Sequence, residues 1–140
     1  ENGIPCMVTG GKVGTAAWIF AHAVLKRKNV ALVGEDIGYA PGTLHYNTQF
    51  YKELLELLGE ERIAEAFIEI YNPHLNETWF VDPTFYWYRK IFLELSLEAD
   101  CTTYNCTEGG TLFGESIQFI PLEHFLSKFS AQGAQGGHNG

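Results

Sequence analysis

The chain has no run of apolar residues approaching twenty, few basic side chains and only three cysteines. The missing apolar run argues against an ordinary transmembrane helix, and the first three residues lack the pattern of a signal peptide. The number of cysteines is odd, and no two of them form a CxxC pair: they are Cys6, Cys101 and Cys106. This pattern argues against a disulfide framework and against a structural zinc site. We therefore expect a cytoplasmic protein with reduced thiols.

The balance of charge argues against broad nucleic-acid binding. Nine Lys and Arg face seventeen Asp and Glu, which gives a net charge of −8, whereas nucleic-acid binding needs a basic surface to neutralise phosphates. A bound phosphate would need local help from backbone N–H groups, a few basic side chains or a divalent cation held by carboxylates. With 140 residues, 46% of them hydrophobic, the chain is long enough for one domain with its own core.

Apolar runs bounded by glycine alternate with segments of helical period, which is typical of an α/β domain. The sequence predicts strands at 4–8, 30–33, 77–81, 101–105 and 116–120, and helices at 13–25, 49–58, 60–71, 83–98 and 121–129. The first strand, helix and second strand form a βαβ unit, so their strands should be parallel. We expect residues 1–129 to form a three-layer, mostly parallel, Rossmann-like sheet with helices on both faces. Residues 130–140, rich in Gly and Gln, are predicted to be a flexible tail.

Two of the predicted strands end alike, each followed by acidic and glycine residues. Ligands of α/β sheets bind at the carboxyl ends of the strands, and glycine lets a ligand approach the backbone closely. Asp36 and Glu108 are therefore candidates for catalysis and for holding Mg²⁺ against phosphates, with capping or loop-ordering roles as the alternative. The candidate nucleotide-binding residues are Gly10, Gly11, Lys12, Thr107, Gly109 and Gly110. Plain turns would explain the glycines equally well.

His45 and Lys12 each have a functional and an ordinary interpretation. His45 lies in the long loop after the strand at 30–33, where it could act as a catalytic base, and the alternative is an ordinary loop histidine. Lys12 follows two glycines at the start of the helix predicted at 13–25, where it could meet a phosphate. One lysine in a glycine turn is no Walker motif, and an exposed, solubilising lysine is the simpler explanation.

Three motifs follow one another over about residues 5–126. They are Gly10-Gly11-Lys12-Val13 with an alanine-rich helix, Leu32-Val33-Gly34-Glu35-Asp36 with Tyr39 and His45, and Asn105-Cys106-Thr107-Glu108-Gly109-Gly110 with Gly114 and Pro121-Leu122. In order and spacing the chain resembles the domain shared by archaeal 6-hydroxymethylpterin diphosphokinases and the motility accessory factor proteins that modify flagellin. That family is similar to the sialyltransferases that use CMP-sugars, in its sheet and in its glycine-rich strand ends. The resemblance implies a nucleotide-binding transferase.

Members of this family usually carry an earlier Gly-Pro-Ser-Leu type turn, and no such turn occurs here. We therefore expect either a whole domain or the carboxyl half of a larger domain, in which case this chain lacks the first strand unit. The leading hypothesis is a glycosyltransferase-like enzyme that uses a nucleotide sugar, because the chain is acidic and has no basic phosphate clamp beyond Lys12. Flagellin or a surface polysaccharide precursor would be the acceptor. The alternatives are an ATP-dependent, pterin-type diphosphokinase and a non-catalytic nucleotide- or sugar-binding fragment, and the oligomeric state is open.

Overall fold

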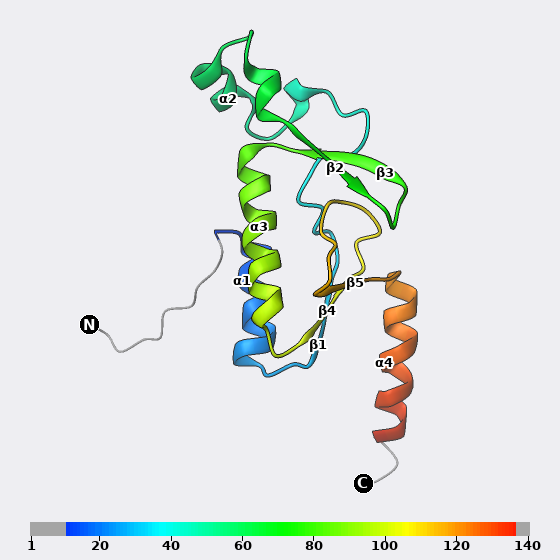
Figure 1. Ribbon diagram of the computed structural model, residues 1–140. Coiled ribbons are helices and arrows are strands. Elements are labelled where there is room, and N and C mark those ends of the chain that lie inside the picture. Colours follow the sequence, from blue (N-terminus) through cyan, green and yellow to red (C-terminus); the bar gives the residue numbers. More distant parts are fainter. Residues whose placement is uncertain (1–10, 137–140) are drawn as a thin grey trace, which may run out of the picture.

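Three short parallel strands form the central sheet of the computed structural model, which describes residues 11–136 (Figure 1). The strand order is β1-β4-β5, and the bounds are β1 Asn29–Leu32, β4 Thr102–Asn105 and β5 Ile117–Phe119. Asn29 of β1 lies opposite Thr102 of β4, and Thr103 of β4 lies opposite Ile117 of β5. The parallel strands predicted near 30–33, 101–105 and 116–120 are therefore present. The strand predicted at 4–8 lies outside the described residues.

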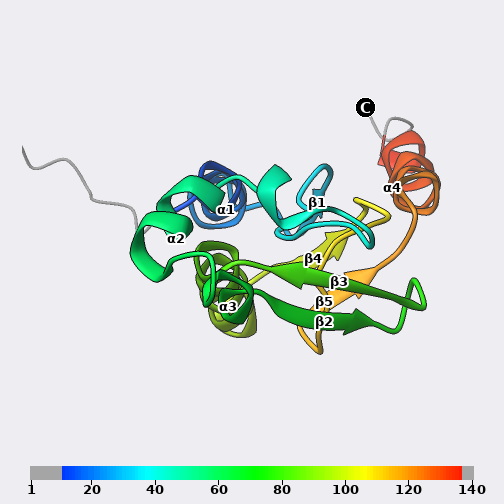
Figure 2. The same cartoon turned by 90° about the horizontal axis from the view of Figure 1, so that it is seen from above.

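Helices lie on both faces of this sheet (Figure 2). Their bounds are α1 Val13–Ile19, with a π-helical turn at Phe20–Val24, α3 Pro83–Glu98 and α4 Leu122–Gly136. The indole Nε1 of Trp18 in α1 donates to Thr103 Oγ1 at 2.9 Å, whereas Phe125 and Phe129 of α4 pack on the ring of Tyr104. Thr103 and Tyr104 are neighbours in β4 and point to opposite faces, which puts α1 and α4 on opposite sides.

Helix α4 is longer than expected. It was predicted at 121–129, but it extends to Gly136, so it continues into the segment 130–140 that was predicted to be a flexible tail. Within residues 11–136 no helix is long and apolar enough to cross a bilayer.

A second, antiparallel sheet lies over the carboxyl ends of the parallel strands (Figure 1). It is the hairpin of β2, Ile68–Asn72, and β3, Glu77–Val81. The prediction of a helix at 60–71 is wrong. This segment forms a single 3₁₀ turn at Ile63–Ala66, which is followed by β2. Ile68, Ile70 and Tyr71 are β-branched or aromatic, and such residues favour a strand once a partner strand is available. The preceding helix α2, Tyr51–Leu58, was predicted correctly and ends at Gly59.

The main core lies between the sheet and the pair of helices α1 and α3. Its buried members are Trp18, Ile19, Leu32, Ile37, Phe92, Leu112 and Ile117. The rings of Trp18 and Phe92 lie 4.6 Å apart, which joins α1 to α3. Each such side chain contributes about 1.5–3 kcal/mol when it is removed from water. Ile37 and Leu112 belong to loops after β1 and β4, so the core also anchors the loops that form the candidate site.

A polar junction anchors the start of α3. Asp82 is fully buried, and its carboxylate accepts from the Phe85 backbone N–H at 2.8 Å, which confirms the helix start predicted from Asp82 and Pro83. The same carboxylate accepts from the Tyr39 hydroxyl at 2.6 Å. Burial, together with this hydrogen bond, raises the pKa of Tyr39. The loop after β1 is therefore joined to the corner between β3 and α3.

Candidate functional site

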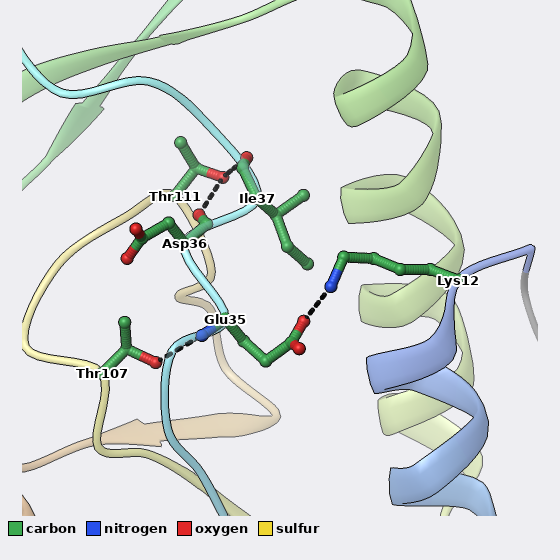
Figure 3. A network of polar contacts seen from close by, with 6 residues as sticks. All are labelled: Lys12, Glu35, Asp36, Ile37, Thr107 and Thr111. Atoms are coloured by element: carbon green, nitrogen blue, oxygen red, sulfur yellow. Dashed lines mark hydrogen bonds and ion pairs between the residues drawn. The ribbon is translucent and has the colours of Figure 1, made fainter. Parts of the chain in front are cut away.

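Two loops meet at the carboxyl end of the parallel sheet. The acidic loop, residues 33–38, follows β1, and the glycine loop, residues 106–112, follows β4. The Thr111 N–H donates to the Asp36 carbonyl at 2.9 Å, and its hydroxyl donates to the Ile37 carbonyl at 2.6 Å. The Glu35 N–H donates to Thr107 Oγ1 at 3.0 Å (Figure 3). The structure therefore brings together the two acidic and glycine-bearing strand ends of the sequence.

Glycine is required where these loops touch. Gly110 has a φ of +87°, and a Cβ on it would lie 2.6 Å from the Cα of Asp36. A Cβ on Gly109 would lie 3.4 Å from Oδ1 of Asp36 and 3.2 Å from the indole of Trp79 in β3. Gly110 is thus explained by the contact between backbones, whereas Gly109 borders the Asp36 carboxylate itself.

The two neighbouring carboxylates have different surroundings. Glu35 forms an ion pair with Lys12, and its carboxylate lies against Gly14 of α1, where a Cβ would collide with it. The Asp36 side chain points the other way, toward the side of Thr107 (Figure 3). Among the described groups, which include the side chains of residues 11–130, no N–H or O–H donates to this carboxylate. Partial burial together with the nearby Glu35 raises the pKa of Asp36. Lys12 therefore neutralises Glu35, whereas the carboxylate of Asp36, an exposed residue, has no ion-pair partner among the described residues.

This environment predicts that Asp36→Asn stabilises the ligand-free protein at neutral pH. Folding raises the pKa of this carboxyl above its ordinary value of 3.8. Its protonated form therefore stabilises the native state at a pH below 3.8, and this stabilisation is lost as the pH rises through the folded pKa. At pH 7 the ionised carboxylate therefore costs stability. We expect a small rise in the melting temperature, because solvent screens a partly exposed charge. The difference should shrink toward pH 3 in a series of thermal denaturations. A lower midpoint for the variant at pH 7 would contradict it.

Glu108 faces a different space from Asp36. It has a φ of +62°, a left-handed conformation that costs a residue with a side chain about 1–2 kcal/mol. With His74, Leu75, Phe119 and Pro121 it lines a cavity of about 340 Å³ beside the glycine loop. Glu108 therefore borders this cavity, while Gly109, the next residue, borders Asp36.

No cluster of three His, Cys, Asp or Glu side chains that could hold a metal occurs in the described part of the chain. Mg²⁺ does not need such a cluster, because it usually keeps several waters and binds through one or two carboxylates and the substrate phosphates. The exposed carboxylate of Asp36 could serve as one such Mg²⁺ ligand.

His45 packs among aromatic side chains. Its imidazole stacks on Phe67 at 4.0 Å and meets the edge of Phe80, as part of the packing around the hairpin. Among the described residues no polar contact joins it to Asp36 or Glu108, so the geometry favours the ordinary loop histidine over the catalytic base. Gly11 has a φ of +79° and packs against Tyr88 of α3, and Gly10 lies outside the described residues.

Asn72 and His74 belong to the site and were missed in the sequence. Asn72 is fully buried, and its side-chain amide donates to the Gly110 carbonyl at 2.9 Å while its Oδ1 accepts from the His74 N–H at 2.9 Å. The signal is Asn72-Pro73-His74, which predicts the end of a helix from sequence and in the structure forms the start of the hairpin turn. The asparagine thus connects the hairpin to the glycine loop.

Comparisons with protein-family models, curated proteins and solved structures find no match for this chain. Its function is therefore inferred from the geometry and chemistry of the site.

Proposed function

We propose that this chain is the nucleotide-binding part of a glycosyltransferase-like enzyme that uses a nucleotide sugar. The observation that carries this proposal is the Asp36 carboxylate. It lies at the carboxyl end of a parallel strand, has no donor among the described residues, and borders the glycine backbone at Gly109. Ligands of parallel α/β sheets bind at that end of the strands.

In this proposal Asp36 holds Mg²⁺, whose charge offsets that of the nucleotide phosphates. The metal is needed because Asp36 and Glu35 would otherwise repel an anionic ligand, and Lys12 is already paired with Glu35. Lys12 and Thr107 act indirectly, by holding the acidic loop against α1 and the glycine loop. Glu108 is the remaining candidate for a base, since His45 packs elsewhere.

Two further observations support glycosyl transfer over diphosphoryl transfer. Transfer of phosphoryl groups develops charge that enzymes usually stabilise with Lys or Arg side chains as well as metal. The lysine beside this site is paired with Glu35, and Arg89 donates its Nε–H to the Thr111 carbonyl of the glycine loop. The adjoining cavity is lined by one carboxylate and no Lys or Arg. The parallel sheet with helices on both faces is compatible with the α/β domain of the family that the chain resembles, and it does not separate the two chemistries.

A thermal-shift panel of CMP-, UDP- and GDP-sugars and ATP, each with and without Mg²⁺, tests the proposal. A ligand that binds only the native state at a hundred times its Kd stabilises it by about 2.7 kcal/mol. We expect one nucleotide sugar to raise the midpoint only with Mg²⁺, and Asp36→Asn to abolish that rise.

Asp100→Asn is the matched control, because Asp100 is an exposed aspartate at the amino end of β4 and the variant should keep the full shift. The absence of a shift with every nucleotide would contradict the proposal. A shift with ATP alone would select the diphosphokinase instead.

A further inference from the structure

The cavity beside Glu108 has the size and lining of a small-molecule site. Its volume of about 340 Å³ falls at the lower end of the range for such sites, about 300–1,000 Å³. Three parts of the chain meet there. Glu108 belongs to the glycine loop, His74 and Leu75 belong to the turn between β2 and β3, and Phe119 and Pro121 connect β5 to α4.

One wall of the cavity is a stacked pair of rings. The imidazole of His74 lies parallel to the ring of Phe119, with centroids 4.8 Å apart and an angle of 12°, and it meets the edge of Phe113 at 6.1 Å. Because His74 and Phe119 already stack on each other, no flat base can be inserted between them. A ligand can contact only the outer face and the edges of this stacked pair, together with Leu75 and Pro121. Such a surface suits the C–H groups of a saturated ring.

The charge of the lining selects the ligand further. Glu108 is the one acidic side chain of the lining, and an ionised carboxylate only accepts hydrogen bonds. It therefore favours ligands with hydroxyl donors and repels phosphates and carboxylates, for which the lining offers no Lys or Arg. Its left-handed backbone conformation is the kind of local strain that concentrates at binding and catalytic sites.

The position of His74 is set by buried contacts. The Asn72 side chain holds the His74 backbone on one side and the Gly110 carbonyl on the other, and Asn72 is fully buried. The backbone that carries the stacked wall is thus held in place, whereas Glu108 is exposed and reaches the cavity from the glycine loop. Gly109, the next residue, borders Asp36.

We propose that this cavity binds the neutral sugar ring of the acceptor, with Glu108 accepting hydrogen bonds from its hydroxyls and the His74 and Phe119 wall contacting its C–H face. The inference rests on the proposed function, since it places an acceptor beside the nucleotide site at Asp36. It narrows the acceptor class to an uncharged glycoside.

Saturation-transfer NMR titration with methyl glycosides of neutral hexoses and N-acetylhexosamines tests the cavity directly. We expect weak binding to the wild type, a loss of affinity of about five- to tenfold in Glu108→Gln, and a similar loss in His74→Ala. Glu115→Gln is the matched control and should bind as the wild type does, because Glu115 is exposed and lies outside the cavity lining.

The outcomes separate this inference from the proposed function. If a nucleotide sugar binds but no glycoside does, or if glycoside affinity is unchanged in both cavity variants, the acceptor site is overturned while the nucleotide site stands. Competition between a free nucleoside and the glycoside, sensitive to Glu108→Gln, would make the cavity a base subsite and also overturn it. Glycoside binding that depends on Glu108, without any nucleotide shift, would support the sugar site and contradict the proposed function.

Discussion

Replacement of Gly110 by alanine is expected to lower the free energy of unfolding by about 3–4 kcal/mol, a large fraction of the stability of an ordinary domain. The φ of +87° costs an alanine about 1–2 kcal/mol. The new Cβ would also lie 2.6 Å from the Cα of Asp36, a backbone atom that no rotamer change can move, and such overpacking costs about 1–3 kcal/mol. Urea denaturation should show a lower midpoint with an unchanged slope.

Gly34 provides the matched control for this substitution. Its φ of +76° is close to that of Gly110, but no atom lies within 4 Å of an added Cβ. Gly34→Ala should therefore show the backbone cost alone, about 1 kcal/mol, part of which is offset by the stiffer unfolded chain. The difference between the two variants measures the contact between the acidic loop and the glycine loop. Equal losses in both would show that these loops do not touch as described.

Replacement of Asn72 by alanine is expected to cost about 3 kcal/mol. The substitution leaves the buried Gly110 carbonyl without its donor, which costs about 1–3 kcal/mol, and it removes the acceptor of the partly buried His74 N–H, which adds about 1 kcal/mol. Because the side chain is fully buried, water cannot replace the amide without a rearrangement of the loop. Chemical denaturation measures the loss, and His74 should become more mobile in its NMR resonances.

Asn47→Ala separates this effect from the general effect of losing an asparagine. Asn47 is exposed, at the end of the 3₁₀ turn His45–Asn47, and its replacement should change the free energy of unfolding by less than about 0.5 kcal/mol. A loss for Asn72→Ala as small as that for Asn47→Ala would mean that the hairpin is not connected to the glycine loop through this side chain.

Local signals in the sequence predicted much of the fold. Asp82 and Pro83 define the start of α3 through capping and the fixed φ of proline, both of which are short-range effects. The apolar runs at β1 and β4 predicted strands of one mostly parallel sheet, and parallel strands place the residues that follow them at the same edge. That is why Asp36 and the glycines 109 and 110 could be placed together before the structure was known. That these two strands are direct neighbours is known from the structure.

The rest depends on contacts between distant residues. The segment 60–71 has apolar residues at helical spacing, yet it contains β2, because pairing with β3 and packing outweigh that periodicity. Which carboxylate is neutralised was decided by Lys12, which pairs with Glu35 rather than remaining exposed or free for phosphate. The Asn72 side chain donates a hydrogen bond to Gly110, which lies far from it in the sequence, and no local sequence pattern predicts such a bond.

The most direct test of the nucleotide site is an amide NMR titration with the nucleotide sugar chosen by the thermal panel, in which paramagnetic Mn²⁺ replaces Mg²⁺. The account predicts ligand-dependent broadening centred on the backbone amides of Asp36 and Gly109, with no such effect at Asp100 at the opposite end of β4. It also predicts that Asp36→Asn removes the broadening. Broadening centred elsewhere in the chain, or unchanged in Asp36→Asn, would contradict a nucleotide site at the carboxyl ends of β1 and β4.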